Sequence, residues 1–370
     1  MKTILTVVGA RPQFIKAAAV SKALRESARY REIVVHTGQH YDRNMSQTFF
    51  DELDMKLPNH NLEVAGGNHG AQTGEILKRL EPVMINEQPE MVLVYGDTNS
   101  TLAGALCAVK LHLPLAHVEA GLRSFNRMMP EEINRIVADH LSSLLFCPTK
   151  AAVKNLEREG IVSNVWSTGD VMYDVALQFA KKSKVKSTIL SDLSLQSNGY
   201  ILATVHRAEN TDRKERLANI VAALAAVAED VPVVLPIHPR TRKMLQSFGL
   251  ADRLDKIRVL DPVGFLDMVA LESHAKLIAT DSGGVQKEAY FHRVPCVTLR
   301  GETEWVETVE AKWNMLAALD TVEGILSAFR DSMAFSGVRS TIDEYGSGDA
   351  AQKIIHGIDM SIRAREKVAK

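Results

Sequence analysis

Three carboxylates in the first half of the chain lie where a buried strand would end or a helix would begin. Asp97 closes the apolar run MVLVYGD, Glu119 closes LPLAHVEAG, and Glu131 follows Pro130 at the start of a helical pattern. Because aspartates often cap helices and acids are favoured in a first turn, structural roles for Asp97 and Glu131 stay open. Glu119 ends a buried strand, so capping does not explain it. Carboxylates gathered at one place could act as general acids and bases.

A second set of residues suits the binding of an anion such as a phosphate. Ser282, Gly283 and Gly284, in TDSGGVQKEA, lie where a strand passes into a helix. Backbone N–H groups and the helix dipole would face a ligand there. An ordinary turn capped by Asp281 or Ser282 is the structural alternative. Glu288, further along the same helix, could accept hydrogen bonds from ribose hydroxyls or be a solvated acid.

Cations and histidines follow other strand ends. Arg11 and Lys16, in VVGARPQFIK, bracket a helix start and could reach a diphosphate or lie on the surface. The same stretch lacks the G-x-G-x-x-G spacing, so it does not indicate a dinucleotide site. His206, in ATVHRAEN, is a candidate phosphate ligand or general acid, and His238 and Arg240, in IHPRTR, are similar candidates.

The elements that must position these residues are short apolar runs alternating with helical patterns, which is typical of parallel strands buried on both faces. In the first half the predicted strands are residues 3–8, 32–38, 91–97, 113–121 and 144–149. In the second half they are residues 200–206, 231–239, 257–264, 276–284 and 294–301. Such a series predicts an α/β protein with two Rossmann-like, doubly wound domains. Ligands of these sheets bind at the carboxyl ends of the strands, so we expect the polar residues there to line one cleft.

The length of 370 residues favours two domains over one. We expect a first domain over residues 1–170, carrying the acids, and a second over residues 171–348, carrying the anion site. Residues 349–370 read as an amphipathic helix that packs back on the first domain. Residues 180–199 are polar and charged, and we expect a loop there.

Composition excludes several classes of protein. The chain has 44 basic and 45 acidic residues, a net charge of −1, which argues against a general nucleic-acid binder. No apolar run approaches the roughly 20 residues that a membrane span needs, and the apolar run before Gly9 is too short for a signal peptide. Cys107, Cys147 and Cys296 are far apart and form no C-x-x-C pair. We expect buried free thiols in a reducing cytoplasm.

Taken together, the motifs resemble those of the non-hydrolysing UDP-N-acetylglucosamine 2-epimerases along essentially the whole chain. In order, they are GARPQFIK, TGQHYDRNM, YGDTNSTLAGA, HVEAGLRS, MPEEINR, HRAEN, DPVGFL and TDSGGVQKEA. The resemblance implies two Rossmann-like domains in the GT-B arrangement, a UDP-sugar in the interdomain cleft, and a final helix that crosses back. It also implies a homodimer and neither a metal nor a nicotinamide cofactor.

The implied reaction eliminates UDP across C1–C2 of the sugar, holds a 2-acetamidoglucal, and adds UDP back with the opposite configuration at C2. By resemblance, Asp97, Glu119 and Glu131 form the acid/base group, and His206 assists the departure of UDP. Which carboxylate acts at which step stays open. We assign the neighbouring Glu132 to the helix start.

The resemblance also implies the binding residues. Arg11 and Lys16 would lie near the sugar and the diphosphate, and Phe265, in DPVGFL, in the uracil pocket. The implied contacts of the diphosphate and the ribose are Ser282, Gly283, Gly284 and Glu288. In some relatives an effector site is known, and this chain matches it only at Gln39 and His40, so allostery stays open.

One motif departs from the family pattern. Where relatives have Thr-Glu-Arg-Pro-Glu, this chain reads TEWVE, so Trp305 replaces an arginine whose role cannot be carried over. TEWVE, HPRTR and VYGDTNSTLAGA look most like the branch that acts on UDP-2,3-diacetamido-2,3-dideoxy-glucuronate. Arg240 and Arg242 could bind its C6 carboxylate, although relatives acting on UDP-N-acetylglucosamine share them.

We therefore expect a cytoplasmic UDP-N-acetylglucosamine 2-epimerase that serves surface polysaccharide synthesis, with the diacetamido-glucuronate as the alternative substrate. A GT-B glycosyltransferase, a hydrolysing epimerase and a non-catalytic UDP-sugar sensor are the rival functions, since a fold does not fix a function.

Overall fold

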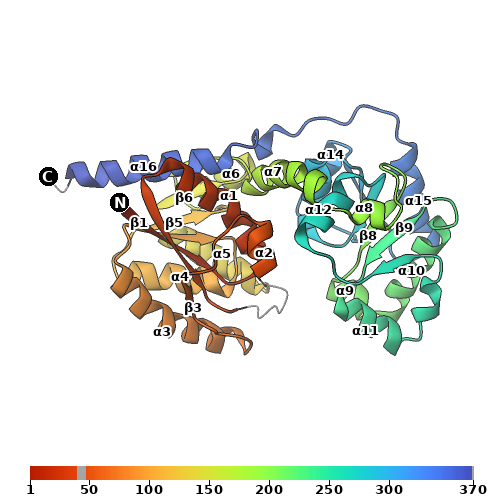
Figure 1. The fold of residues 1–370 in the computed structure, drawn as a ribbon, viewed down its shortest axis with the longest axis horizontal. Helices are drawn as coiled ribbons and strands as arrows, with labels where there is room; N and C mark the ends of the chain where they lie inside the picture. Colours follow the sequence, from red (N-terminus) through yellow and green to blue (C-terminus); the bar gives the residue numbers. More distant parts are fainter. Residues whose placement is uncertain (40–46, 369–370) are drawn as a thin grey trace. The chain divides into compact units, whose positions relative to one another are not determined.

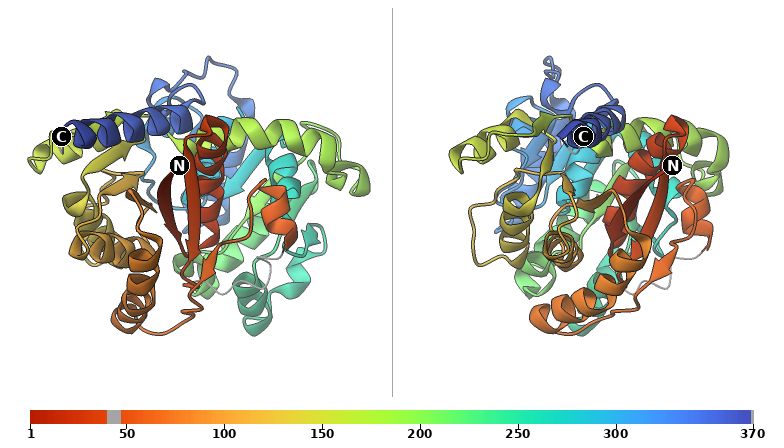
Figure 2. Two further views of the ribbon diagram at one scale, coloured as in Figure 1. Left: turned by 60° about the vertical axis from the view of Figure 1, so that its left-hand side comes forward. Right: turned by 90° about the vertical axis from the view of Figure 1, so that its left-hand side faces the viewer.

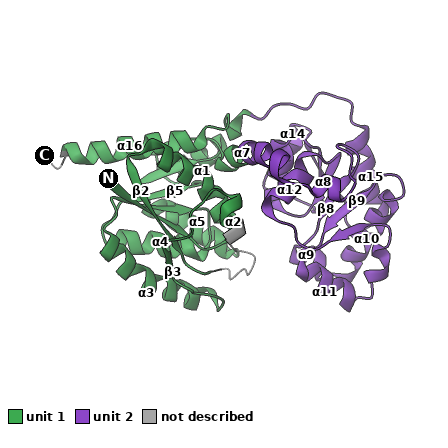
Figure 3. Cartoon of the chain, in the orientation of Figure 1, with its two compact units in different colours: residues 1–175, 343–370 green, residues 176–342 purple. Residues whose placement is uncertain are grey.

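The computed structural model describes residues 1–39 and 47–368 (Figure 1). His40, which matches part of the effector site of relatives, lies outside the described residues. The chain divides into two compact units, residues 1–175 with 343–370, and residues 176–342 (Figure 3). In each unit a parallel sheet carries helices on its faces.

Unit 1 contains a seven-stranded parallel sheet in the order β3-β2-β1-β4-β5-β6-β7. Its strands are β1 (Lys2–Val8), β2 (Tyr30–His36), β3 (His60–Asn61), β4 (Met91–Tyr95), β5 (Leu115–Val118), β6 (Leu144–Cys147) and β7 (Val165–Ser167). Its helices are α1 (Arg11–Ser27), α2 (Gln47–Glu52), α3 (His69–Glu87), α4 (Asn99–Lys110), α5 (Pro130–Leu141), α6 (Lys150–Arg158) and α16 (Ala350–Val368). The strand order reverses between β1 and β4, which is where doubly wound sheets bind ligands.

Both faces of the unit 1 sheet are covered, as its continuous apolar strands require. Helices α3, α4 and α5 pack on one face, against side chains such as Leu5, Val92 and Leu115 (Figure 1). Helix α1 lies on the other face, and α16 packs beside it (Figure 2). The start of α16 is fixed by Asp174, whose carboxylate accepts hydrogen bonds from the backbone N–H groups of Ala350 and Ala351 at 3.1 and 2.8 Å.

Unit 2 contains a six-stranded parallel sheet in the order β10-β9-β8-β11-β12-β13. Its strands are β8 (Ile201–Thr204), β9 (Val233–Pro236), β10 (Arg258–Leu260), β11 (Leu277–Thr280), β12 (Cys296–Thr298) and β13 (Asn314–Leu316). Its helices are α8 (Ile189–Asp192), α9 (Ala208–Thr211), α10 (Lys214–Val227), α11 (Pro239–Ser247), α12 (Phe265–Ser273), α13 (Gly283–Phe291), α14 (Val306–Glu310) and α15 (Val322–Ala334). The order reverses between β8 and β11, which repeats the Rossmann arrangement of unit 1.

The strands of unit 2 are continuous apolar runs because successive side chains point to opposite faces of the sheet and both faces are covered by helices. Ile201 and Ala203 face α10, α11 and α15, whereas Leu202 between them faces α8, α12 and α13. The predicted α/β class with two doubly wound sheets is therefore confirmed. The three cysteines are buried free thiols, as expected.

The predicted loop over residues 180–199 is wrong. Helix α7 (Val171–Lys186) runs through the first part of it, and the short α8 follows. The helix buries Phe179 and Ser183 completely, while Lys181, Lys184 and Lys186 are exposed. The lysine-rich composition hid this narrow apolar stripe.

No helix among residues 1–39 and 47–368 is both long and apolar enough to cross a lipid bilayer.

Candidate functional site

Lys16 and Glu119 meet at the carboxyl ends of the unit 1 strands. Lys16, on α1, and Glu119, directly after β5, form an ion pair, and their side chains are only 16% and 11% exposed. The Lys16 ammonium also lies beside Gly96, since a Cβ there would be 3.5 Å from Nζ. Gly96 precedes Asp97, so the cation stands between the two strand ends that carry predicted acids.

Asp97 is held by α5. Its carboxylate pairs with Arg135, and its backbone carbonyl accepts a hydrogen bond from the Asn134 amide at 2.9 Å. The structural alternative for Asp97 was a helix cap, but the residue that caps α4 is Thr98. Asp97 remains 31% exposed, so a ligand can reach it.

Glu131 lies exposed in the first turn of α5, and its side chain makes no hydrogen bond or ion pair within the part of the chain that the structure describes. Its neighbour Glu132 is buried and accepts hydrogen bonds from Ser124 and from the Phe125 backbone N–H, at 2.8–2.9 Å. Burial opposes ionisation of Glu132, but these bonds and Arg135 hold its pKa below the ordinary value. Glu132 therefore fixes the loop before α5, a role that its position at a helix start did not indicate.

The backbone at Glu119 is strained. Its φ of 75° lies in the left-handed region, which costs a non-glycine residue roughly 1–2 kcal/mol. The conformation is held because the N–H groups of Glu119 and Ala120 both donate to the Phe146 carbonyl, at 3.1 and 3.0 Å. Gly121 follows at φ 80°, where a side chain would collide with the Ala152 carbonyl. This turn lets strand β5 end abruptly with the Glu119 carboxylate directed at Lys16.

Gln13, which sequence reasoning missed, joins the ends of β1 and β4. Its side-chain carbonyl accepts hydrogen bonds from the N–H groups of Gly9 and Ala10, at 2.8 and 3.1 Å. Its amide donates to the Tyr95 carbonyl at 2.7 Å. The nearby Arg11, at the first position of α1, places its guanidinium 5.1 Å from the Phe49 ring.

Asp281 performs the equivalent task in unit 2 and was likewise missed. It is fully buried, and its carboxylate accepts hydrogen bonds from the N–H groups of His206 and Arg207 and from the Asn210 amide, at 2.9–3.1 Å. It thereby joins the end of β8 to the end of β11. Its position before a helix indicated only a cap, whereas the N-cap of α13 is Ser282, whose side chain makes no capping bond.

The first turn of α13 is crowded and polar. A side chain at Gly283 would collide with the Glu304 carboxylate, so an acidic group already packs against this helix start. Gly284 is open, with only the Ser282 hydroxyl within 4 Å of a Cβ placed there, at 3.8 Å. Backbone N–H groups and the helix dipole favour an anion at such a place.

Trp305 and Lys287 form a pair beside this turn. The buried Lys287 ammonium lies 4.2 Å from the centre of the Trp305 ring, and the indole nitrogen lies 3.5 Å from an ideal Cβ on Gly283. A desolvated cation–π contact of this kind is worth about 2 kcal/mol. Lys287, a buried residue of α13 itself, is therefore the cation that contacts Trp305, the residue at which TEWVE departs from the family pattern.

His206 lies next to His238, with ring centres 5.6 Å apart. Burial lowers the pKa of His206 below its ordinary value, with Arg207 and His238 adding to the effect and Asp281 opposing it. His238 caps α11, and its ring accepts a hydrogen bond from the Arg240 N–H at 3.2 Å.

Three further predicted binding residues lie in unit 2. The Arg240 guanidinium donates to both oxygens of Asp212, at 2.7 and 2.5 Å. Phe265 begins α12 and meets Phe179 edge-on, with ring centres 5.1 Å apart. Glu288, on α13, lies near enough to the buried Glu272 to raise its pKa, although burial is the larger cause.

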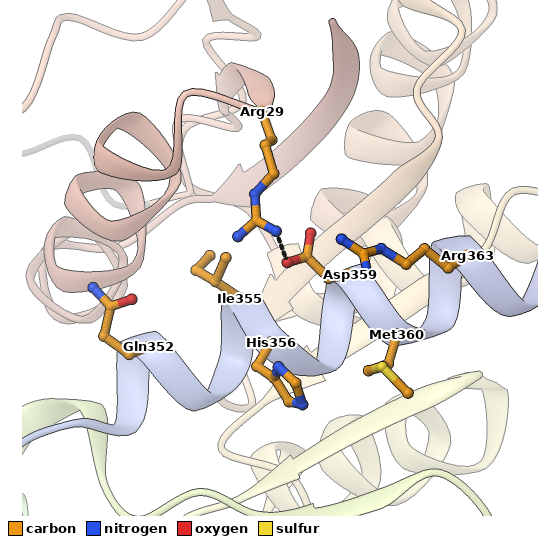
Figure 4. A pocket seen from close by; sticks show the side chains of 7 residues that line it. All are labelled: Arg29, Gln352, Ile355, His356, Asp359, Met360 and Arg363. Carbon is orange, nitrogen blue, oxygen red and sulfur yellow. Dashed lines mark ion pairs between the residues drawn. The ribbon is translucent and has the colours of Figure 1, made fainter.

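A separate pocket lies along α16 and contains none of the predicted site residues (Figure 4). Its lining is Arg29, Gln352, Ile355, His356, Asp359, Met360 and Arg363. Within residues 1–39 and 47–368, no three His, Cys, Asp or Glu side chains are grouped so that they could hold a metal ion.

Comparison with known proteins matches this geometry to one family. The family model described as UDP-N-acetylglucosamine 2-epimerase matches residues 22–359. A UDP-N-acetylglucosamine 2-epimerase homolog of Methanococcus maripaludis is 52% identical over 95% of this chain and 98% of its own. The UDP-2,3-diacetamido-2,3-dideoxy-D-glucuronate 2-epimerase of Pseudomonas aeruginosa is 51% identical over 95% of this chain and 98% of its own.

A solved structure is also similar over nearly the whole chain. It is that of the Methanocaldococcus jannaschii UDP-GlcNAc 2-epimerase in complex with UDP-GlcNAc and UDP. It has a TM-score of 0.86 and 43% sequence identity, and the match covers 97% of this chain and 100% of that one.

Proposed function

Since the chain belongs to the UDP-N-acetylglucosamine 2-epimerase family, we propose that it interconverts UDP-N-acetylglucosamine and UDP-N-acetylmannosamine without releasing UDP. The observation that carries this proposal is the buried pair of Lys16 and Glu119 at the strand ends of unit 1. A carboxylate kept ionised by an adjacent ammonium is suited to remove a proton from a sugar carbon.

The chemistry requires such a group because the C2 hydrogen of a 2-acetamido sugar is not adjacent to a carbonyl. Direct deprotonation would give no stabilised anion, whereas elimination of UDP across C1–C2 gives a neutral glucal. Proton removal and return on opposite faces of C2 need more than one acid or base. We assign this task jointly to Glu119, Asp97 and Glu131. The proposal includes that the exposed Glu131 side chain contacts the bound sugar.

The nucleotide part is assigned to unit 2. In this proposal the diphosphate lies at the first turn of α13, against Ser282, Gly283 and Gly284, with Arg11 and His206 as further donors. Donors aimed at the leaving diphosphate would lower the barrier to elimination, because negative charge develops there. Glu288 would bind the ribose hydroxyls.

Phe265 and His238 complete the proposed nucleotide contacts. Phe265, which is buried at the start of α12 against Phe179, would pack against the uracil ring through its aromatic side chain. His238 would add a donor beside His206. Retention of UDP until it adds back distinguishes this reaction from hydrolysis.

The diacetamido-glucuronate is a second candidate substrate. Its support is the 51% identity to the Pseudomonas aeruginosa enzyme, together with Trp305 of the TEWVE motif, which packs on Lys287 of α13. Arg240 and Arg242 were the predicted partners of the extra C6 carboxylate. They are paired with Asp212 and Asp261, so that carboxylate would have to compete with an existing acid.

The proposal also includes a homodimer that acts in the cytoplasm in surface polysaccharide synthesis. Light scattering on the purified chain tests the dimer, and loss of a surface polysaccharide on deletion tests the pathway.

The direct test is to incubate the protein with each UDP-sugar and follow the products by NMR. Formation of the C2 epimer with no free UDP supports the proposal, and the preferred substrate gives the faster conversion. Free UDP in the amount of sugar consumed would establish a hydrolysing enzyme instead. Conversion only when an acceptor sugar is added would establish a glycosyltransferase.

A further inference from the structure

His117 and Asp139 form a fully buried pair behind the acids of unit 1. His117 lies on β5, two residues before Glu119, and its Nδ1 is 2.7 Å from Oδ1 of Asp139, on α5. Its other ring nitrogen, Nε2, is 2.7 Å from the carbonyl oxygen of Gly96. Both side chains are completely removed from solvent.

The hydrogen-bond pattern fixes the charges of the pair. The Gly96 carbonyl can only accept, so Nε2 of His117 carries a proton. The second oxygen of Asp139 accepts from the Gly121 N–H and from Arg123, at 3.0 and 2.6 Å, so Asp139 is an ionised acceptor on both oxygens. Nδ1 of His117 must then carry a proton too. The pair is an imidazolium and a carboxylate, and burial, which would raise the pKa of Asp139, is outweighed by His117 and Arg123.

The pair makes hydrogen bonds to the two turns that adjoin Asp97 and Glu119. Gly96 precedes Asp97 and Gly121 follows Glu119 by two residues, and the two glycines have φ values of 62° and 80°. The His117 ring donates to the first turn and the Asp139 carboxylate accepts from the second. Since Asp139 is on α5, the same pair also ties the turns to the helix whose Arg135 reaches Asp97.

We propose that the His117–Asp139 pair is a positioning device, which sets the Asp97 and Glu119 carboxylates for proton transfer at C2 without touching the sugar. The inference rests on the proposed function, since it assigns a task in that reaction. A displacement of about 1 Å in such groups can cost about 100-fold in rate, so the pair would act on kcat and leave nucleotide binding alone.

A purely structural role is the rival explanation, and the chain offers a matched control. Arg123, at the far end of the network, forms a bidentate ion pair with Glu159, which is 27% exposed. Glu159→Gln removes one charge from the network and touches neither turn. Asp139→Asn removes one charge and also the acceptor that keeps both protons on His117.

The test measures kcat, KM, the isotope effect of C2-deuterated substrate and UDP affinity for the full-length protein and both variants, well below their melting temperatures. We expect Asp139→Asn to lower kcat about 100-fold, to raise the isotope effect and to leave UDP affinity unchanged, with Glu159→Gln close to the parent. Equal loss of kcat in the two variants would show that the network only stabilises the fold. A parent protein that epimerises neither sugar would remove the proposed function, and this inference with it.

A second measurement does not depend on any variant. Nitrogen-15 NMR of the labelled parent protein should show His117 with both ring nitrogens protonated in the folded protein. A neutral His117 ring under these conditions would overturn the assignment of charges, and with it the positioning device, even in an active enzyme.

Discussion

The Lys16 ammonium and the Glu119 carboxylate form an ion pair at the carboxyl ends of the unit 1 strands, with each side chain less than one-fifth exposed. Burying two charges carries a desolvation free energy that often exceeds their mutual attraction. Well-packed hydrophobic residues at the same place would often stabilise the fold at least as well. Within this pair, the backbone of Glu119 has a positive φ, which glycine would adopt more easily. Stability alone does not explain this combination, and a carboxylate held ready for proton transfer does.

The strain at Glu119 can be measured by comparing Glu119→Gly with Glu119→Ala. Both variants remove the carboxylate and leave Lys16 buried, but only alanine has to adopt the left-handed conformation. We expect the glycine variant to be more stable by about 1 kcal/mol in urea denaturation, and both to be inactive. Equal free energies of unfolding would show that position 119 is not held at a positive φ.

The role assigned to the first turn of α13 is tested by Gly283→Ala. The added methyl group meets the mobile end of Glu304, so the fold should tolerate it, but it would stand where the diphosphate is proposed to lie. We expect the Kd of UDP to rise about tenfold, roughly 1.4 kcal/mol, by calorimetry, with little change in melting temperature. Gly74→Ala, on the open surface of α3, is the matched control. An unchanged Kd would move the diphosphate elsewhere.

UDP binding should depend on the protonation of His206. In the free protein its pKa is lowered from the ordinary value of histidine, chiefly because the ring is buried. A bound diphosphate would stabilise the imidazolium and raise that pKa, so the complex takes up a proton. UDP should therefore bind more tightly as the pH falls through the interval between the two pKa values.

The phosphate of UDP titrates in a similar range, so His206→Asn provides the baseline for this measurement. As the pH falls, the affinity for UDP should rise in the parent protein relative to the variant, because only the parent gains the His206 charge. If the two curves run parallel, His206 does not contact the diphosphate.

Variants of Arg240 and Asp212 test whether Arg240 distinguishes the diacetamido-glucuronate from UDP-N-acetylglucosamine. If the C6 carboxylate of the diacetamido-glucuronate binds Arg240, it replaces Asp212, so Arg240→Ala should raise the KM for that substrate about tenfold. Asp212→Asn should lower the same KM, because the competing acid is gone. The KM for UDP-N-acetylglucosamine should change little in either variant. Equal changes for both substrates would end the proposed role of Arg240.

The sequence predicted most strands of the two sheets because they lie in apolar runs with both faces buried. It did not predict β3, β7 or β13, which have two or three residues, whereas β10 and β12, with three residues each, were predicted. It also misjudged α7, where the four lysines, all in its second half, obscure the buried side chains that hold the helix in place.

Side chains at strand ends were easy to find because glycines and titratable groups interrupt apolar runs there. The residues whose side chains join one strand end to another were not found from the sequence. The hydrogen bonds from Gln13 to Tyr95, from His117 to Gly96 and from His206 to Asp281 span 82, 21 and 75 positions of the sequence, and no local pattern shows such a bond. Glu131 and Glu132 are adjacent acids at one helix start, and only the fold shows that the second is buried.

The central claim is that the chain moves a proton at C2 while UDP stays bound. The most direct measurement is to incubate the protein with UDP-N-acetylglucosamine in D2O and follow C2 by NMR, beside Glu119→Gln with its UDP affinity measured separately. The account predicts deuterium at C2 of both epimers with UDP retained, and a variant that binds UDP but exchanges nothing. Epimers that keep hydrogen at C2, or full exchange by the variant, would contradict it.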